Sequence, residues 1–536
     1  MLMSHTALRN VIGSLTLLPI LLGAPSQADS KPFSLPFAVP PGVNTWLLEQ
    51  HYGNTQEAFV YGKYWYAAGQ GLHFGVDFEA PCGTPVIAIA DGVVRALDSS
   101  LFGAEPHNLV IQHEDLGYAS VYGHLRARSP LTLGQPVQRG DLVGEVGDPD
   151  GTCQSRPHLH LEIRSLDYRT AYNPAALIDA DWHRLAQLGR PIGITFARDL
   201  NNPQRWQRLF DQPNIQIGGP ALNAYSRAYP PTARLAPTPY TPPALRTLPA
   251  TAFQARRLTA PPCCSGAWWQ PNGELAYLAQ PSDRFPMTPS PDGRYAFAIE
   301  HGRAFLIDRS SGLRTPLLTR GAWPTFSPSG AQLLWHVRPG DYFPAMQPLT
   351  EIWLADLNGE ARLLRTWQGG EVYWLDEKRL LLVQVTPRTQ RHTLSLLDLD
   401  SGRLATLGSF DNLRRLSVAP GGQHIAFLLP FQAQPQHSGL YVLATRQGAA
   451  PQKLPFIGSF RWQDSENLLY IPFMSDAPAL HRYNIRTQRD RRLEGNADLL
   501  LVENDEWSVA PDGQRIVLRS ARDGALWLLS LRDATF

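Results

Sequence analysis

The sequence predicts a mainly β protein with two folded parts: an antiparallel β barrel or sandwich toward the N-terminus and a six-bladed β-propeller at the C-terminus. Two observations support this fold class. Between residues 71 and 180, short segments alternate apolar and polar side chains with a period of two, which is the pattern of β-strands. Beyond residue 263, a turn followed by an alternating apolar strand recurs every roughly 37 to 48 residues. Repeats of about 40–45 residues with four short strands are typical of propellers.

The first 28 residues predict a secretory signal peptide. Arg9 precedes an apolar stretch at 11–24, and a motif of small residues ending at Ala28 provides a cleavage site. The stretch is short for a membrane span, and no later run of about 18 apolar residues appears. We expect the mature chain to begin at Asp29 and to act in the periplasm or outside the cell, with no stable membrane span. An uncleaved anchor is the alternative.

Length and charge limit the remaining possibilities. A chain of 536 residues is too long for one core and indicates two or three domains. The 48 Lys and Arg residues nearly balance the 47 Asp and Glu residues, so nothing favours nucleic-acid binding. A proline-rich stretch is typical of an extended linker. We expect a leading segment at 29–70, a first domain at 71–180, a connector at 181–229, the proline-rich linker at 230–262 and the propeller at 263–536.

Five side chains that can bind metals or transfer protons lie in three short segments. GLHFGVDF (71–78), VYGHL (121–125) and RPHLHLEIR (156–164) contain His73, Asp77, His124, His158 and His160. A hydrolytic zinc site needs three nitrogen or oxygen ligands, an open position for water and proton-transferring groups nearby. An isolated H-x-H or H-x-x-x-D would be unremarkable on a protein surface. The three segments together predict a zinc hydrolase.

The third segment has the alternation of a strand. Residues two apart in a strand point to the same face, so His158 and His160 should enter one cavity while the leucines between and after them face the core. Glu162 shares the histidine face, either as a partner that orients a ligand or in a salt bridge at the rim. A turn near Gly75 would let the histidine and aspartate of the first segment converge.

With these motifs, residues 46–178 resemble the lysostaphin-type (LytM) zinc endopeptidases, which cut the peptide stems or bridges of bacterial peptidoglycan. The resemblance also covers PCGTPVIAIADGVV after the first segment. It implies that His73, Asp77 and His160 bind one Zn²⁺ and that His124 and His158 are catalytic, either of them being the general base. Many relatives that have lost some of these positions act as regulators. Because all five are filled here, we expect an active enzyme.

Two further features of this region need an interpretation. TPVIAIADGVVRAL and QPVQRGDLVGEVG resemble the halves of a lipoyl-carrier barrel, but no lysine is available between them, so the similarity indicates a compact barrel fold and not a carrier. Cys82 and Cys153 lie in loops beside the expected metal site, and we expect a disulfide that clamps the two ligand-bearing segments together. Zinc ligation by these cysteines is the alternative. The pairing of Cys263 and Cys264 stays open.

The C-terminal repeats resemble the S-P-D-G units of TolB-type, WD-repeat-like periplasmic propellers. Six copies begin at Ser290, Ser327, Leu375, Ala419, Gln463 and Ala510. The last copy has only about three strands, so we expect a strand at 268–278 to complete it; a seventh blade built on 268–278 is the alternative. Tryptophans recur at Trp268, Trp269, Trp323, Trp353, Trp374 and Trp462. They favour packing within the blades over a carbohydrate-binding platform.

Two functions remain compatible with the sequence. The first is a secreted zinc endopeptidase that hydrolyses peptidoglycan peptides, with the propeller as a docking module for an envelope protein or a glycan. The second is a noncatalytic regulator of the cell envelope that has kept the peptidase fold. The complete set of five site residues favours the enzyme.

Overall fold

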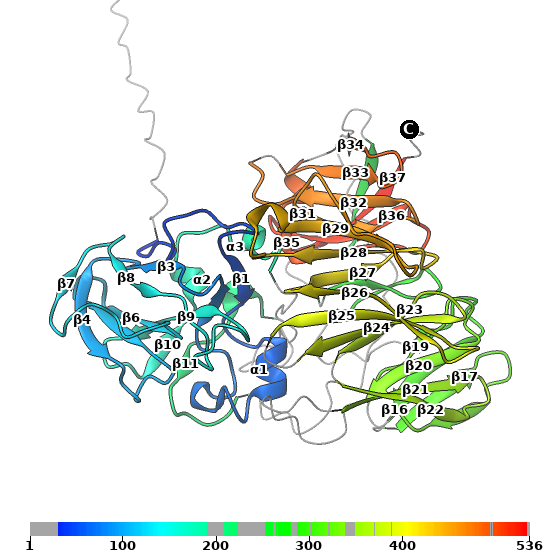
Figure 1. Cartoon of the computed structure of the whole chain (residues 1–536), viewed down its shortest axis with the longest axis horizontal. Coiled ribbons are helices and arrows are strands. Elements are labelled where there is room, and N and C mark those ends of the chain that lie inside the picture. The colour runs from blue at the N-terminus through cyan, green and yellow to red at the C-terminus, as the bar shows by residue number, and fades with distance from the viewer. Residues whose placement is uncertain are drawn as a thin grey trace, which may run out of the picture.

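The computed structural model describes residues 31–189, 207–222 and, with short gaps, 252–532 (Figure 1). An N-terminal part and a larger C-terminal part lie side by side, and nearly all regular structure is β-sheet. The expected signal peptide and most of the expected proline-rich linker lie outside the described residues. Within the described residues, no helix combines the length and the apolar character needed to cross a membrane.

The N-terminal part is built on a nine-stranded antiparallel sheet in which seven strands follow the order β1-β2-β9-β6-β5-β4-β7, with β10 and β11 continuing from β9. Its strands are β1 (Leu47–Gln50), β2 (Val76–Glu79), β4 (Gly92–Leu97), β5 (Leu109–His113), β6 (Tyr118–Gly123), β7 (Pro136–Val137), β9 (His158–Ser165), β10 (Thr170–Tyr172) and β11 (Ile215–Gln216). A second sheet pairs β3 (Pro85–Ile87) with β8 (Leu142–Glu145). Three short helices accompany them: α1 (Gln56–Tyr61), α2 (Pro174–Leu177) and α3 (Trp182–Leu185).

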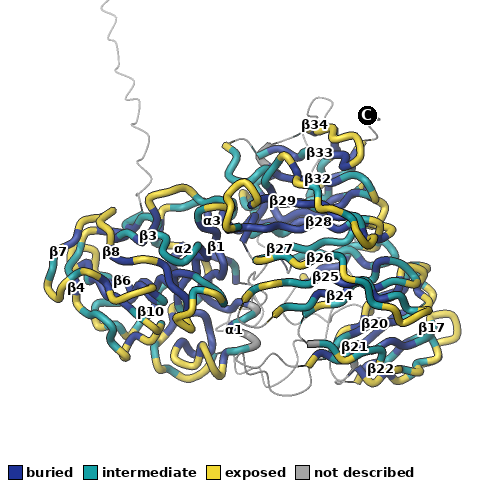
Figure 2. The backbone as a smooth tube through the Cα atoms, in the orientation of Figure 1, coloured by how far each residue is buried: buried dark blue, intermediate teal, exposed yellow. Residues whose placement is uncertain are grey.

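The core of this part lies under β2, β6 and β9, which are among its most deeply buried strands (Figure 2). Leu159, Leu161 and Ile163 of β9 are fully buried in one apolar cluster with Phe78 of β2. The period-two pattern of the sequence therefore predicted the core face of β9 correctly. The sheet also includes β1, from the expected leading segment, and β11, from the expected connector.

The C-terminal part contains six four-stranded antiparallel sheets among its described residues, as expected for six propeller blades. Each of the six sequence repeats supplies the turn between the first two strands of one sheet. The sheets comprise β15 (Thr288–Pro289), β16 (Tyr295–Glu300), β17 (Arg303–Asp308) and β18 (Arg314–Leu317); β19 (Thr325–Phe326), β20 (Gln332–Val337), β21 (Leu349–Asp356) and β22 (Ala361–Gln368); β23 (Glu371–Trp374), β24 (Arg379–Thr386), β25 (Arg391–Asp398) and β26 (Leu404–Asp411); β27 (Arg414–Val418), β28 (His424–Leu429), β29 (Gly439–Ala444) and β30 (Gln452–Lys453); β31 (Gly458–Trp462), β32 (Asn467–Pro472), β33 (Leu480–Asn484) and β34 (Arg489–Leu493); and β35 (Val502–Val509), β36 (Arg515–Ser520), β37 (Leu526–Leu531) and β12 (Phe253–Arg257).

The last sheet is completed by an unexpected segment. We expected residues 268–278 to supply its fourth strand, and this prediction is wrong: β12 pairs with β37 instead. Residues 268–276 form a separate two-stranded sheet of β13 (Trp268–Trp269) and β14 (Leu275–Ala276). Trp269 donates to the carbonyl of Ser508 and Gln270 to that of Met287, so this small unit contacts the last sheet and the first. The strand β12 lies within the range expected as linker.

Several of the repeated tryptophans join neighbouring sheets. The indole N–H groups of Trp374 and Trp462 donate to the carbonyls of Thr325 and Ser417, each on the first strand of the preceding sheet. Trp323 likewise donates to the hydroxyl of Thr288. Buried or half-buried indoles usually need such a partner for their N–H group. The contacts support a packing role for these tryptophans.

Candidate metal centre

Two neighbouring strands and one loop assemble the centre. Antiparallel pairing of β2 with β9 places Asp77 directly opposite His160, and Glu79 opposite His158. His73 precedes β2 in a loop that bridges to Gly53. A Cβ atom at Gly75 would lie 2.6 Å from a ring carbon of His160, so only glycine at this turn leaves room for that imidazole. Close packing against His160 therefore requires a glycine at the turn that the sequence predicted near Gly75.

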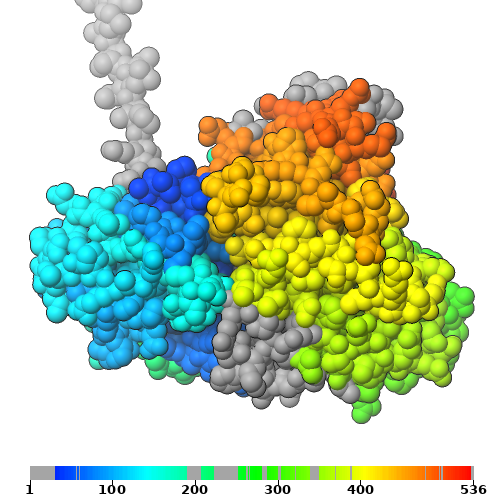
Figure 3. Space-filling view, viewed as in Figure 1, coloured from blue at the N-terminus to red at the C-terminus, as the bar shows by residue number. Residues whose placement is uncertain are grey.

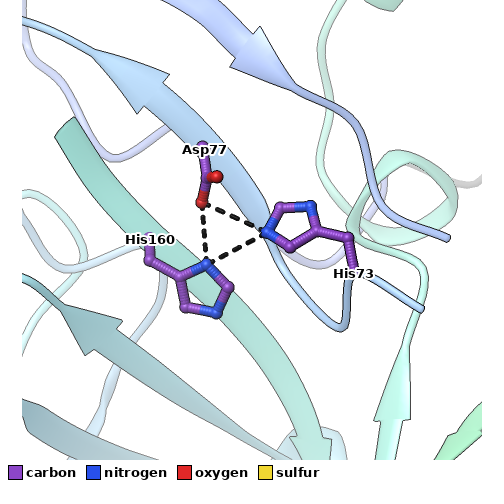
Figure 4. A group of neighbouring side chains, drawn as sticks. All are labelled: His73, Asp77 and His160. Carbon is purple, nitrogen blue, oxygen red and sulfur yellow. Dashed lines mark hydrogen bonds and ion pairs between the residues drawn. The ribbon is translucent and has the colours of Figure 1, made fainter. Parts of the chain in front are cut away.

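Three donor atoms meet at one point (Figure 4). His73 Nε2 lies 3.2 Å from His160 Nδ1 and 3.3 Å from Asp77 Oδ1, and the last two atoms are 2.7 Å apart. Tetrahedral zinc with bonds of about 2.0–2.1 Å separates its ligand atoms by about 3.3 Å. Two of the three separations therefore suit zinc as they stand, and the third would open by about half an ångström. All three side chains are buried.

The two histidines of the triangle have their rings held by partners outside it. His73 Nδ1 donates to the carbonyl of His51 at 2.7 Å, which leaves the Nε2 lone pair facing the other donors. The Nε2 of His160 lies 3.4 Å from Glu162, which also accepts from Arg164 at 2.6 Å. Such partners set the tautomer and the orientation of metal-binding imidazoles. Glu162 is fully buried, so its ion pair with Arg164 lies beside His160 in the interior and not at an exposed rim.

The charges of the centre favour a bound cation. Burial alone would raise the pKa of Asp77, but the surrounding histidines lower it well below its usual value, so the group is a carboxylate. Burial opposes charging of His160, yet its bonds to Asp77 and Glu162 raise its pKa to about 9. Donors this close repel one another unless a proton or a metal ion lies between them. The donor set of two imidazoles and one carboxylate fits zinc.

The other two predicted residues lie beside the triangle. The rings of His124 and His158 are 4.7 Å apart, and His158 Nε2 is 3.9 Å from Asp77 Oδ2. His158 Nδ1 donates to the carbonyl of Arg156 at 2.8 Å, and His124 Nδ1 to that of Glu105. In both rings, Nε2 therefore points away from the carbonyl that Nδ1 contacts. His124 is half-buried while the other four residues are buried, so the centre is most open to solvent on the His124 side.

These two imidazoles are neutral near pH 7. Burial lowers the pKa of His158 to about 4, against the opposing charge of Asp77. Burial together with the neighbouring His158 and His160 lowers the pKa of His124 well below its usual value. A neutral imidazole whose Nδ1–H is already bonded has a free Nε2 lone pair. Either ring can thus accept a proton from a water molecule in the centre.

The expected disulfide between Cys82 and Cys153 is present, and this prediction is confirmed. It joins the loop after β2 to the loop before β9, the two strands that supply Asp77 and His160. Zinc ligation by these cysteines is thereby excluded. Cys264 is also disulfide-bonded, and Cys263 lies outside the described residues.

Several residues around the centre were not predicted from the sequence. Arg156 lies 3.7 Å from Glu49 and 3.3 Å from Glu57, and its guanidinium faces the ring of Trp65. Trp65 and Tyr64 are exposed, at 42% and 54%. Tyr66, in the same loop, packs edge-on against His73. The sequence signals for this group were weak: Arg156 begins the third motif segment, and residues 52–70 are rich in tyrosine and glycine.

Residues 71–174 match peptidase family M23. This M23 region contains all five predicted site residues.

The relatives match only in part. Lysostaphin from Staphylococcus staphylolyticus is 29% identical over 127 residues, which are 23% of this chain and 26% of lysostaphin. The DD-carboxypeptidase/endopeptidase Mpg from Neisseria meningitidis serogroup B is 38% identical over 93 residues, 17% of this chain and 20% of Mpg. The chain therefore spans about a quarter or less of the length of these relatives. Among solved structures, TolB from Acinetobacter baumannii aligns with 43% of this chain and 60% of its own, at 15% identity and a TM-score of 0.29.

Proposed function

We propose that the protein is a zinc-dependent endopeptidase that hydrolyses peptide bonds in the stems or cross-bridges of peptidoglycan. The observation that carries this proposal is the convergence of His73, Asp77 and His160 at mutual distances of 2.7–3.3 Å, next to the paired rings of His124 and His158. Three ligands leave a fourth tetrahedral position free for water, as in catalytic zinc sites. The match to peptidase family M23 and the name of one relative, the DD-carboxypeptidase/endopeptidase Mpg, agree with peptide-bond hydrolysis.

Each side chain has a distinct task in this proposal. His73, Asp77 and His160 would hold the metal, which when bound acts as a Lewis acid and makes water acidic near neutral pH. His158 Nε2 is buried within 3.9 Å of Asp77 and is suited to take the proton of the attacking water. His124, at the open side, presents a free Nε2 lone pair and is suited to accept a hydrogen bond from the attacking water, which orients that water.

Substrate would approach from the side of His124. The aromatic side chains Tyr64 and Trp65 are exposed on the loop that also packs Tyr66 against His73, and they offer apolar surface to a bound peptide. We further propose that residues 1–28 direct the protein to the periplasm or the exterior, and that the propeller docks an envelope protein or a glycan.

Digestion of purified sacculi tests the proposal. The protein is incubated with sacculi with and without a chelator, and the released muropeptides are identified by mass spectrometry. We expect loss of one stem or bridge bond, abolished by the chelator and in His158→Ala. The zinc content should stay near one per chain in His158→Ala and fall to zero in His73→Ala. His481→Ala, which removes a histidine on β33 of the propeller, serves as the control and should keep both properties.

The outcome also separates the enzyme from a regulator. Intact sacculi together with no bound zinc would contradict the enzyme and favour a noncatalytic envelope protein. Intact sacculi with one zinc per chain would contradict peptidoglycan as the substrate while leaving the metal centre in place.

A further inference from the structure

The propeller reaches into the N-terminal part next to the metal centre. Figure 3 shows the two parts packed directly against each other. The first strands of two propeller sheets, β27 and β35, are involved, and each has a bulge where its pairing with the next strand shifts. Arg415 in the first bulge and Asn504 and Asp505 in the second have positive φ angles of 52–58°. Bulges redirect side chains, and strained non-glycine residues are often found at functional sites.

The first bulge contacts β2, the strand that carries Asp77. Arg414 forms a buried ion pair with Glu79, the residue of β2 that lies opposite His158 on β9. The next residue, Arg415, donates to the backbone carbonyl of Gly189 at 3.3 Å. Both side chains of the ion pair are less than a tenth exposed. Such pairs hold their partners strongly in place, because breaking one leaves an uncompensated buried charge.

The second bulge is connected to a metal ligand. Asn504 Oδ1 accepts a hydrogen bond from His51 Nε2 at 2.7 Å. The backbone carbonyl of His51 in turn accepts from His73 Nδ1, also at 2.7 Å. Two backbone hydrogen bonds between Gly53 and His73 complete the attachment. A continuous chain of bonds thus runs from the propeller through the segment 51–53 to a donor of the triangle.

The two bulges are joined by a buried ion pair between Arg415 and Asp505. The carboxylate of Asp505 on β35 accepts from Arg415 on β27 and from Arg461 and Ser459 on β31, so it joins three first strands of the propeller. Leu47 of β1 and Leu188 lie in one apolar cluster with propeller residues such as Leu428 and Phe460. Apolar burial on this scale makes the contact part of the folded core and not a loose domain interface.

His73 depends on this support more than the other two donors. Asp77 and His160 lie on paired strands, so the sheet itself holds their backbones. His73 lies in a loop, and the orientation of its ring depends on the carbonyl of His51. Among the described residues, the ring of His51 has its hydrogen bond with Asn504 and no partner for Nδ1.

We propose that Asn504 of the propeller is a positioning residue of the zinc site, which holds His73 in its binding orientation through His51. The proposal rests on the zinc site of the proposed function. It gives the propeller a role within the peptidase itself, beside any docking role, because one support of the metal centre lies more than 400 residues further along the chain.

Substitutions at Asn504 test the proposal through zinc affinity. Asn504→Gly removes the acceptor and, because glycine accepts a positive φ, adds no backbone strain. Asn504→Asp keeps an acceptor oxygen at the same place. Asn412→Gly is the matched control, since Asn412 is another propeller asparagine with a positive φ of 56°. Zinc affinity of the full chain is measured by competition with a chelating chromophore, and ligand geometry from the visible spectrum of Co²⁺ in the same site.

Outer partners of metal ligands typically contribute 10–100-fold in affinity. The hydroxyl of Tyr52 also bonds the segment 51–53 to the carbonyls of Ala171 and Pro213. Because this second attachment remains when Asn504 is replaced, we expect a loss of affinity at the lower end of that range. Asn504→Gly should weaken zinc binding about tenfold and alter the Co²⁺ spectrum, whereas Asn504→Asp and Asn412→Gly should resemble the unaltered protein. An unchanged affinity in Asn504→Gly, or an equal loss in Asn412→Gly, would overturn this inference alone. An unaltered protein that binds no zinc would overturn the proposed function as well.

Discussion

Removal of the disulfide between Cys82 and Cys153 should destabilise the metal centre by a calculable amount. The bond closes a loop with a sequence separation of 71 residues. In the chain-entropy model, a cross-link over a loop of this length lowers the entropy of the unfolded chain enough to stabilise the fold by about 4 kcal/mol at 25 °C. The double variant Cys82→Ala/Cys153→Ala should lose this contribution. The strands β2 and β9 should open more often, since the disulfide joins the loops next to them.

Native-state hydrogen exchange measures this loss where it occurs. A decrease of about 4 kcal/mol in the free energy of opening corresponds to roughly a thousandfold faster exchange of the most protected amides. Mass spectrometry of peptides covering β2 and β9 would report it without depending on bound metal. Peptides from β24 and β25, inside the propeller, provide an internal reference. Thr152→Ala, in the same loop as Cys153, controls for side-chain changes that leave the disulfide intact.

A small effect would refute the reasoning. If exchange in β2 and β9 rose less than about fivefold, equivalent to about 1 kcal/mol, the unfolded chain would already be restricted in this region. The disulfide would then contribute to the geometry of the loops and not to stability.

Three further predictions concern side chains around the centre. Glu79→Gln should lower the free energy of unfolding by about 3 kcal/mol because it leaves Arg414 charged and buried. The double variant Glu79→Gln/Arg414→Met should recover most of this loss in urea unfolding. Additive losses of the two substitutions would contradict a coupled pair. Glu162→Gln should weaken zinc binding by about 10–100-fold, measured by chelator competition, and unchanged affinity would argue against a role in orienting His160. Burial lowers the pKa of His51 to about 4 in the folded protein, whereas its pKa in the unfolded chain is about 6.5. The unfolded state therefore binds the proton more readily. The stability present above pH 6.5 should be lost as the pH falls toward 4, by up to about 3 kcal/mol. The free energy of unfolding of the metal-free protein, measured at several pH values, should fall with pH over this range. The number of protons taken up on unfolding should be smaller by about one in His51→Gln, and an identical pH dependence would contradict the assignment.

Local patterns in the sequence were sufficient to predict much of the centre. The alternation of HLHLEIR fixed the faces of β9, and the pairing of β2 with β9 then brought Asp77 opposite His160 as the motifs implied. The six propeller repeats coincide with six sheets because each repeat contains the turn between two adjacent strands. The faces of β9 and the turns of the repeats depend on residues within about ten positions of one another, where the strand period acts directly. The convergence of Asp77 with His160, 83 positions apart, was expected from the family resemblance.

The failures involve contacts between distant residues. β12 was hidden because FQARR is short, ends in two arginines and follows a proline-rich stretch, and its pairing with β37 is what makes it a strand. Arg414 and Glu79 are 335 residues apart, and no local pattern in either segment indicates the other. The sequence left Glu162 between the rim and the surroundings of His160 because an acidic residue is seldom fully buried unless paired. Its partners Arg164 and His160 provide that pairing.

The pairing of β12 with β37 affects the order in which the molecule can be completed during synthesis. A chain that leaves the ribosome N-terminus first exposes β12 long before β37, so the sheet that contains both strands cannot close until residue 531 has been made. That sheet includes β35, which carries Asn504. An unfinished or truncated product would possess His73, Asp77 and His160 without the propeller contact that holds the first of them. The architecture thereby delays full assembly of the candidate metal centre until β37 has been made.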